Sequence, residues 1–401
     1  MKTRMSDALP DIGAPARTRP RARVTAGEHV MIYLPKLIVG GAEVAMVRLA
    51  QGLAREGCQV TLVLHTMQGM ARELAGDLPI ADLGVGSTRG ALPRLARLLR
   101  RERPDVLVSG LTHNNIMAVA AVLVSRRACR LVLTEHAPVT ALMRSRSEWR
   151  YRVLPWLLPF AYGLADAVVA VSSGVADDLA TLLGPRRRQL VQVIYNPVLT
   201  PDWQALADAP VDDLWFAEGA PPVVLAVGRL SVEKNLPLLL DAFGLLRKRG
   251  SAARLLILGE GPERAGLEER IRREGLSACV RMPGQSPRVL AYMHRAAVFV
   301  LTSKFEGFGN VLVEAMAAGI PVVSTDCPVG PREVLAGGRY GELVAQDSAQ
   351  AVAEAIGRAL ISPGDVKAAQ SRAQDFTVEK SVCGYRMLFA RLGIAHREKL
   401  A

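Results

Sequence analysis

The chain has 401 residues, of which 50% are hydrophobic and 22% are charged, a composition typical of a globular α/β protein and unlike that of a disordered one. This length exceeds what one ordinary core holds, so we expect two domains with a cleft between them. The five cysteines have no paired spacing, which argues against a disulfide framework and a zinc site and favours a reducing cytoplasm.

The net charge of +12 lies almost entirely in the first half of the chain. Residues 1–200 carry 26 Lys plus Arg against 15 Asp plus Glu, whereas residues 201–401 carry 24 against 23. A basic half suits nucleic acid, an anionic membrane or a phosphorylated substrate, and it equally describes a solvated arginine-rich surface. Because aromatic residues are only 5% of the chain and are not interleaved with the arginines, we do not expect nucleic acid binding.

Residues 1–26 are rich in Arg, Pro and Ala without an apolar run, so we expect a flexible basic leader and no signal peptide. The longest apolar stretch, Val153 to Val171, contains Pro155, Pro159 and Asp166 and is therefore a poor membrane-spanning helix. We expect it to be buried or interfacial in a soluble protein.

From residue 27 to 195, short apolar runs alternate with amphipathic segments, the pattern of a parallel, doubly wound sheet. The expected strands are His29–Leu34, Gln59–His65, Val106–Ser109, Leu131–Thr134 and Val168–Val171, and the expected helices are Ala42–Glu56 and Leu92–Arg103. Asn196 to Pro222 then carries five prolines and no strand-like run, so we place an interdomain linker at 196–221.

Residues 222–375 repeat the pattern, which predicts an α/β fold of two Rossmann-like domains facing a central cleft. The expected strands are Val223–Val227, Arg254–Leu258, Cys279–Met282, Ala297–Leu301 and Pro321–Ser324, and the expected helices are Asn235–Arg249, Glu263–Glu274, Pro287–Ala296 and Asn310–Ala318. In sheets of this kind ligands bind beyond the carboxyl ends of the strands.

One such strand end carries two cations, Arg229 and Lys234, just before a helix expected to open at Asn235. Cations beside a helix N-terminus, which itself favours anions, predict a phosphate-binding site. Arg229 can grip phosphate oxygens with its guanidinium fork and Lys234 supplies a point charge, so the pair could neutralise a pyrophosphate without a metal. The alternative interpretation is a surface ion pair.

A second strand end leads into a glycine-rich segment followed by a carboxylate. Gly307 and Gly309 would let backbone amides approach a phosphate closely. Taken as one helix, the stretch would separate Glu306 from Glu314 by about 12 Å, too far for a glycosidase pair. We therefore expect the two carboxylates to contact different hydroxyls of one ligand, Glu306 on a sugar and Glu314 on a ribose.

These two segments, Val227–Asn235 and Phe305–Val323, resemble the donor-binding signature of GT-B glycosyltransferases of family 4. The resemblance extends over nearly the whole chain from His29. Further matching segments are Gly40-Gly41-Ala42-Glu43, similar to the family's glycine-rich loop, and Val171 to Val175 and Tyr195 to Val198, similar to its recurrent segments.

The resemblance implies a role for each matching residue. Arg229 and Lys234 would bind the diphosphate and stabilise the leaving group, Glu306 would hold the transferred sugar and Glu314 the ribose. The remaining implied donor contacts are Gly40, Gly41, Gly307, Phe308, Gly309 and Asn310. His136 falls where the family commonly has a histidine facing the donor sugar, although a lone histidine at a strand end is as often structural.

His113 and Asn114, which follow the strand Val106–Ser109, lie on the expected cleft side and are candidate acceptor contacts. The segment Cys327 to Leu335 resembles a donor loop of bacterial enzymes that use UDP-sugars. Within it, Arg332 is either a cleft cation or a surface group. Nothing resembles the Asp-x-Asp metal site of the other main transferase fold.

The implied activity is retaining transfer of a hexose or N-acetylhexosamine from a nucleotide diphosphate sugar, with UDP as the favoured nucleotide, to a lipid-linked or growing bacterial glycan. Neither a metal nor another cofactor is expected. Residues 27–195 would bind the acceptor, 222–375 the nucleotide sugar, and 376–401 would form a helix that crosses back to the first domain. The alternatives are a nucleotide-sugar epimerase of the same architecture and a non-catalytic sugar-nucleotide-binding protein.

The basic first half also suggests peripheral attachment to the inner face of the plasma membrane. The helix Leu92–Arg103 places arginines 94, 97 and 101 on one face and leucines 92, 95 and 99 largely on another. Further arginines at 144, 146, 150 and 152 lie beside Trp149, Tyr151 and Trp156. The alternative is an ordinary amphipathic helix packed on its own domain.

Overall fold

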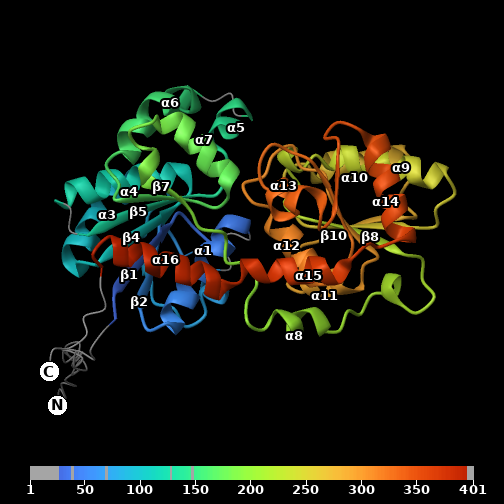
Figure 1. Ribbon diagram of the computed structural model, residues 1–401, viewed down its shortest axis with the longest axis horizontal. Coiled ribbons are helices and arrows are strands. Elements are labelled where there is room, and N and C mark those ends of the chain that lie inside the picture. The colour runs from blue at the N-terminus through green and yellow to red at the C-terminus, as the bar shows by residue number, and fades with distance from the viewer. Residues whose placement is uncertain (1–26, 38–39, 68–70, 127–128, 146–148, 395–401) are drawn as a thin grey trace, which may run out of the picture.

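The computed structural model describes residues 27–37, 40–67, 71–126, 129–145 and 149–394, so the expected leader at 1–26 lies outside the described residues. The described chain forms two α/β domains side by side (Figure 1). Each domain has one wholly parallel sheet with helices in the connections. The predicted fold class, two Rossmann-like doubly wound domains, is confirmed.

The N-terminal sheet has the strand order β3-β2-β1-β4-β5-β6-β7. Its strands are β1 (His29–Leu34), β2 (Gln59–Leu64), β3 (Ile80–Asp82), β4 (Val106–Gly110), β5 (Arg130–Glu135), β6 (Ala167–Ala170) and β7 (Val191–Val193). Its helices are α1 (Gly41–Arg55), α2 (Ala71–Ala75), α3 (Thr88–Glu102), α4 (Thr112–Val124), α5 (Val139–Ser145), α6 (Trp149–Tyr162) and α7 (Ser173–Leu183). The central strands are buried apolar runs, as expected for a parallel sheet covered on both faces.

The C-terminal sheet has the order β10-β9-β8-β11-β12-β13. Its strands are β8 (Val223–Val227), β9 (Arg254–Leu258), β10 (Val280–Gly284), β11 (Val298–Leu301), β12 (Val322–Thr325) and β13 (Glu342–Val344). Its helices are α9 (Leu236–Lys248), α10 (Arg264–Arg273), α11 (Val289–Arg295), α12 (Asn310–Ala317), α13 (Pro331–Val334), α14 (Ala349–Ile361) and α15 (Val366–Ala373).

The predicted elements are present with ends shifted by a few residues at most, whereas several elements have no clear sequence signal. The edge strands β3, β7 and β13 have three residues each, too few to establish an alternating pattern. Helix α4 is apolar over most of its length and therefore lacks the polar face that marks an amphipathic helix.

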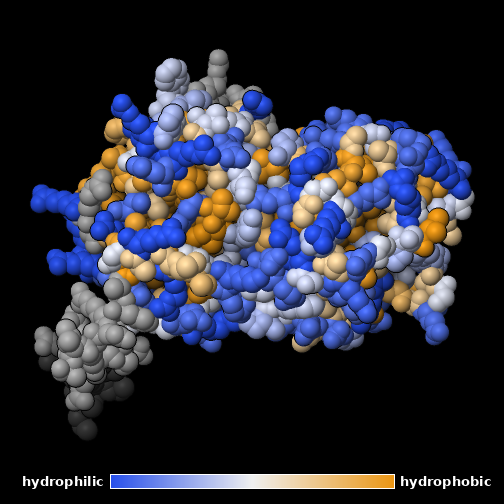
Figure 2. Space-filling model, in the orientation of Figure 1, coloured by the Kyte–Doolittle hydropathy of each residue, from blue (hydrophilic) through white to orange (hydrophobic). Residues whose placement is uncertain are grey.

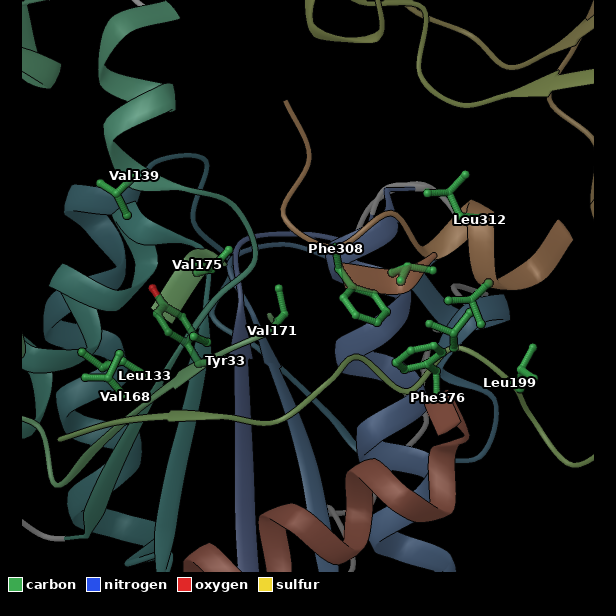
Figure 3. Packing of buried hydrophobic residues seen from close by; sticks show 14 of the residues in the cluster. Tyr33, Leu133, Val139, Val168, Val171, Val175, Leu199, Phe308, Leu312 and Phe376 are labelled. Carbon is green, nitrogen blue, oxygen red and sulfur yellow. The ribbon is translucent and has the colours of Figure 1, made fainter. Parts of the chain in front are cut away.

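Buried side chains form three clusters, one of which spans both domains. Helices α1 and α16 (Val378–Arg391) cover one face of the N-terminal sheet, and α9 and α14 cover one face of the C-terminal sheet. The third cluster includes residues of both sheets and passes between the domains through Phe308 and Phe376, whose ring centroids are 5.1 Å apart (Figure 3). The two domains thus share apolar packing at the place where the chain crosses between them.

The segment expected to be a linker contains regular structure of its own. Helix α8 (Trp203–Asp208) packs against α11 of the C-terminal domain. Farther along, the Trp215 ring lies 5.2 Å from the Arg254 guanidinium and 4.5 Å from that of Arg281. Cation–π contacts and helix packing therefore attach this segment to the C-terminal domain.

Helix α16 returns the chain to the N-terminal domain and packs on α1 (Figure 1). At the crossing, the backbone amides of Val198 and Leu199 donate to the Phe376 carbonyl at 3.0 and 3.1 Å. Along the helix, the Tyr385 and Thr134 hydroxyls hydrogen-bond at 2.9 Å. The chain therefore connects the domains twice, by the linker and by α16.

Because α16 supplies apolar cover for the N-terminal sheet, Phe389→Ala should lower the free energy of unfolding by about 3–5 kcal/mol. Phe389 is 2% exposed, whereas Met387 on the same helix is 55% exposed, so Met387→Ala is the matched control and should change stability little. Urea unfolding followed by circular dichroism measures both. An equal loss in the two variants would contradict the packing role of α16.

Candidate active site

The two sheets meet at the carboxyl ends of their strands, where loops of one domain touch loops of the other. One close approach is between the His136 carbonyl, after β5, and Gly307, after β11. A Cβ at position 307 would lie 1.7 Å from that carbonyl oxygen, so only glycine fits here. Opposite it, the Ser172 hydroxyl donates to the Gly307 carbonyl at 2.7 Å. The expected glycine-rich loop therefore lies directly against the N-terminal domain.

The structure brings Lys234 and Glu306 together at the ends of β8 and β11. The Lys234 ammonium donates to Glu306 Oε1 at 2.6 Å, and the Ser303 hydroxyl donates to the same oxygen at 2.6 Å. Both charged side chains are mostly buried. A small pocket beside them is lined by Gly228, Arg229, Lys234 and Thr302 together with apolar strand residues. Two cations, Arg229 and Lys234, thus line the pocket at a ligand-facing strand end, and the Glu306 carboxylate is held by one of them.

Local backbone geometry places Lys234 at this position. A short 3-10 turn, Val232–Lys234, follows the β8 loop, and Asn235 then adopts a left-handed conformation with φ 48° before α9 begins. Asparagine tolerates that conformation better than most residues. The Thr302 hydroxyl holds the turn by donating to the carbonyls of Lys234 and Asn235 at 3.1 and 3.2 Å.

Arg229 is exposed at the end of β8, beside the same pocket. Its charge acts across the cleft on Glu43 of α1, where it opposes the rise in the Glu43 pKa that burial causes. The Glu43 carboxylate lies against the glycine loop of the N-terminal domain, where a Cβ at Gly40 would be only 2.4 Å from its Oε2. Arg229 of the C-terminal domain therefore lies near the predicted glycine loop of the N-terminal domain.

Glu314 lies on α12, but Glu306 lies in the loop before that helix. The single-helix estimate of their separation is therefore wrong, because α12 begins only at Asn310. The Glu314 carboxylate pairs across the domain boundary with Arg48 of α1, at 3.3 Å. Glu306 and Glu314 are thus each paired with a cation, Lys234 and Arg48 respectively.

The other predicted residues of the glycine-rich loop are Phe308, Gly309 and Asn310, and only Asn310 makes polar contacts through its side chain. The Phe308 side chain is buried against Tyr195 and Phe376, so a ligand can reach this position only through the backbone. Gly309 has φ 93° and precedes α12 without a side-chain cap. The Asn310 amide donates to the Gly41 carbonyl at 3.1 Å, and its oxygen accepts from Asn196 at 2.9 Å.

The His136 imidazole lies against the end of β4, with Nε2 3.5 Å from where a Cβ at Gly110 would be. Both ring nitrogens are buried, and neither has a well-formed hydrogen bond among the described residues, although the Asn196 amide is near enough to favour the protonated ring. Burial is the larger effect and lowers the pKa of His136 to about 4. At neutral pH the ring can therefore offer one donor and one acceptor.

The two candidate acceptor residues have different surroundings. His113 is exposed, whereas Asn114 is buried and its Nδ2 has no hydrogen-bond partner in the described part of the chain. Both residues follow Leu111, whose φ of 75° is uncommon for a residue with a bulky side chain. Helix α4 begins directly after Leu111, at the carboxyl end of β4. Ser109 at the end of β4 also has a buried hydroxyl without a partner among the residues described.

A buried carboxylate that sequence patterns do not reveal, Glu135 at the end of β5, supports the start of α4. Glu135 accepts hydrogen bonds from Thr112 at 3.0 Å and Asn115 at 2.9 Å, and from the Tyr162 hydroxyl. Burial raises the pKa of Glu135 to about 7 despite these donors. The network fixes the start of α4 relative to β5, behind His136 and Asn114.

The segment 327–335, whose sequence resembles a donor loop, makes an interdomain contact that sequence patterns do not reveal either. Arg332 is an exposed group paired with Asp326, so of its two interpretations the surface group fits the structure. Its neighbour Glu333 accepts from the Ser173 amide at 2.8 Å and hydroxyl at 2.8 Å, and from the Tyr195 hydroxyl at 2.8 Å. Ser173 begins α7, so this carboxylate also benefits from a helix N-terminus.

Comparison with protein families agrees with this arrangement. Residues 39–200 match Glycosyltransferase Family 4, and residues 215–376 match Glycosyl transferases group 1. The two matches together cover both domains and the cleft between them. The chain belongs to the GT-B glycosyltransferases.

This glycosyltransferase resembles curated proteins of bacterial glycan synthesis. It is 28% identical to the amylovoran biosynthesis glycosyltransferase AmsD of Erwinia amylovora over 60% of this chain and 64% of that protein. It is 29% identical to the N-acetylgalactosamine-N,N'-diacetylbacillosaminyl-diphospho-undecaprenol 4-alpha-N-acetylgalactosaminyltransferase of Campylobacter jejuni over 55% of this chain and 57% of that protein. The chain thus spans somewhat less than two thirds of the length of these two relatives.

Among solved structures, the crystal structure of Anabaena HepE in complex with UDP-glucose aligns with a TM-score of 0.74 and 23% sequence identity. The alignment covers 90% of this glycosyltransferase and 99% of HepE. At this identity the likeness establishes the fold.

Because a methyl group at position 307 would collide with backbone, Gly307→Ala should separate the domains and reduce any activity of the cleft by about 100-fold or more. Small-angle scattering should show a larger radius of gyration for this variant. Gly266→Ala on α10 is the control, since a Cβ there meets nothing within 4 Å. An unchanged radius and full activity of Gly307→Ala would show that the observed approach is not needed.

Proposed function

We propose that this glycosyltransferase transfers a hexose or N-acetylhexosamine from a UDP-sugar to a lipid-linked or growing bacterial glycan, with retention of configuration and without a metal. The observation that carries the proposal is the pocket at the ends of β8 and β11, which Arg229 and Lys234 line and where Lys234 pairs with Glu306. Cations at this edge suit a diphosphate, and a carboxylate suits sugar hydroxyls.

The two cations would act chiefly on the charge that grows on the departing diphosphate. Arg229 is exposed at the pocket and can form paired hydrogen bonds to phosphate oxygens. The Lys234 ammonium is paired with Glu306, so a bound phosphate would compete with that carboxylate for the ammonium. The attraction increases as the sugar–phosphate bond breaks, which is the differential stabilisation that catalysis requires.

Glu306 is better suited to hold the sugar than to attack it. Its Oε1 already accepts hydrogen bonds from Lys234 and Ser303, which lowers the availability of the carboxylate as a nucleophile. On the opposite side of the cleft, His136 and Asn114 have unpartnered polar atoms within the described structure and would contact the transferred sugar and the acceptor. We therefore infer a same-face displacement, with the acceptor entering beside the departing phosphate.

The nature of the donor and acceptor is proposed from the relatives. HepE was crystallised with UDP-glucose, and the name of the Campylobacter enzyme specifies an undecaprenol-diphosphate-linked acceptor. The basic first half of the chain supports an anionic acceptor of this class.

The proposal is tested by incubating the full chain with single UDP-sugars and a bacterial lipid extract, in EDTA, and identifying products by mass spectrometry. We expect one sugar to be added to a lipid-linked acceptor. Isomerisation of the donor without acceptor would instead identify an epimerase, and UDP binding without any product would identify a binding protein. Activity abolished by EDTA and restored by magnesium would disprove metal independence.

Lys234→Ala should lower kcat by about 100-fold or more while changing the dissociation constant of the intact donor much less, because the ammonium acts mainly in the transition state. Steady-state kinetics and donor titration give the two quantities separately. Lys248→Ala, at an exposed lysine of α9, is the control. A higher KM at unchanged kcat would remove Lys234 from the leaving-group role.

Peripheral membrane attachment is also proposed, through the segment around Trp156 named from the sequence and not through the helix expected at Leu92–Arg103. Leu95 and Leu99 of α3 are buried, and Arg94 donates to the carbonyls of Leu83 and Gly84, so the apolar face of α3 packs inward. No helix in the described part of the chain is both long and apolar enough to cross a bilayer. Figure 2 shows hydrophilic residues over much of one face, with hydrophobic groups in patches.

Helix α6 carries the exposed apolar residues that suit a membrane. Trp156 is 86% exposed and Phe160 65%, one helical turn apart, with Leu157 beside them. Arg144 on α5 is exposed nearby in the chain, whereas Arg146 lies outside the described residues, as do the side chains of Trp149, Arg150, Tyr151 and Arg152. Aromatic rings next to basic residues fit an anionic interface.

Changing both Trp156 and Phe160 to Ser should at least halve the fraction of protein that floats with liposomes containing anionic lipid, and high salt should reduce flotation further. Leu214→Ser, at a residue 85% exposed in the linker, is the control. If the wild type never floats, or if the double variant floats as well as the wild type, α6 is not the membrane contact.

A further inference from the structure

Arg48 lies on α1, seven residues after Gly41, and connects three parts of the chain. Its Nη1 donates to the Val198 carbonyl at 2.5 Å, where the linker leaves the N-terminal domain. The same nitrogen pairs with Glu314 Oε1 at 3.3 Å, across the domain boundary. The Arg48 side chain is 20% exposed and that of Glu314 16%, so the pair is largely shielded from water.

Arg48 is the cation that acts on the buried Glu314 carboxylate. Burial raises the pKa of Glu314, and Arg48 is the charge that opposes this rise. The other charged groups on helices packed against α12 have partners elsewhere. These are Arg295 with the Ala207 and Ala291 carbonyls, Arg332 with Asp326, Glu333 with Ser173 and Tyr195, Arg372 with Asp375, and His294 with the Ala318 carbonyl and Asp208. Lys367 of α15 has an exposed side chain, with no hydrogen bond or ion pair to the described residues.

The geometry leaves half of the carboxylate available. Arg48 occupies Oε1, and no residue described in the structure donates to Oε2. A carboxylate with one oxygen held by a guanidinium and the other unoccupied can accept from the vicinal hydroxyls of a ribose in a fixed orientation.

We propose that Arg48 is a positioning residue for the nucleotide, which holds Glu314 charged and oriented from the opposite domain, so that ribose recognition depends on the closed arrangement of the domains. This inference rests on the ribose role proposed for Glu314. Its consequence is that a residue of the acceptor-binding domain determines how well the donor-binding domain distinguishes a ribonucleotide from a 2′-deoxyribonucleotide.

Calorimetric titration of the full chain with UDP and with 2′-deoxy-UDP tests the inference. In Arg48→Gln, we expect UDP to bind about tenfold more weakly than in the wild type and the preference for UDP over 2′-deoxy-UDP to fall by a similar factor. Arg48→Lys keeps the charge and should retain most of the preference. Arg55→Gln, at an exposed arginine in the last turn of the same helix, is the matched control and should bind as the wild type does.

The pH dependence distinguishes positioning from a structural role. Without Arg48, the Glu314 pKa should rise further, and the binding form is the carboxylate, so UDP binding to Arg48→Gln should improve as pH rises. The ratio of variant to wild-type dissociation constants cancels the ionisation of UDP itself. We expect this ratio to fall severalfold between pH 6 and 9 for Arg48→Gln and to stay flat for Arg48→Lys.

A pH-independent loss that is equal for UDP and 2′-deoxy-UDP, or no loss in Arg48→Gln, would overturn the inference while leaving the proposed donor intact. If Arg48→Gln does not fold, Arg48→Lys decides: a lost ribose preference in this variant despite its charge would overturn the inference, and a retained preference at flat pH dependence would support it. A wild type that does not bind UDP would overturn the proposed donor together with this inference.

Discussion

The contact between the Gly307 backbone and the His136 carbonyl sets how closely the two domains meet. Any side chain at position 307 would enter the space of that carbonyl, so the absence of a Cβ is a condition for the whole arrangement of the cleft. Once the loops touch, the hydroxyl of Ser172 and the amide of Asn310 reach across the boundary. The polar groups of both domains are then within reach of one ligand.

Two kinds of contact hold the domains in this arrangement. Near the crossing of the chain, Tyr195, Phe308 and Phe376 pack with ring centroids 5.1 to 5.5 Å apart, and water has little access there. At the cleft, hydrogen bonds and ion pairs prevail, and these can be exchanged for contacts with water or ligand at small net cost. The apolar contact thus suits a permanent pivot, and the polar contacts suit a surface that opens.

Two carboxylates of the cleft are paired with cations before any ligand binds. Lys234 is paired with Glu306 and Arg48 with Glu314, so neither carboxylate lies buried without a cation. An unpaired buried charge is costly, and removing one partner of such a pair destabilises more than the pair itself contributes. A diphosphate and a ribose would therefore enter a site whose charged groups are already in position, which limits the reorganisation needed on binding.

Much of the fold and part of the site could be predicted because their signals are local. Apolar runs of five or six residues alternating with helices indicate parallel sheets, and the loops after such strands share one edge, which brings Lys234 and Glu306 together. Edge strands of three residues carry no comparable pattern. The predicted start of a helix at Asn310 is confirmed, so Glu306 lies in the loop before α12 and the separation calculated for a single helix does not apply.

The sequence by itself determined the two-domain α/β class, the strand end that carries the two cations and the glycine-rich loop at a second strand end, since each depends on neighbours in the chain. The tertiary structure alone decided the partners of these groups. Arg48 and Glu314 are 266 residues apart, and Ser173 and Glu333 are 160 apart, so no local spacing encodes either contact. Such pairings arise only when two separately folded domains are brought face to face, because the packing at their boundary selects which side chains meet.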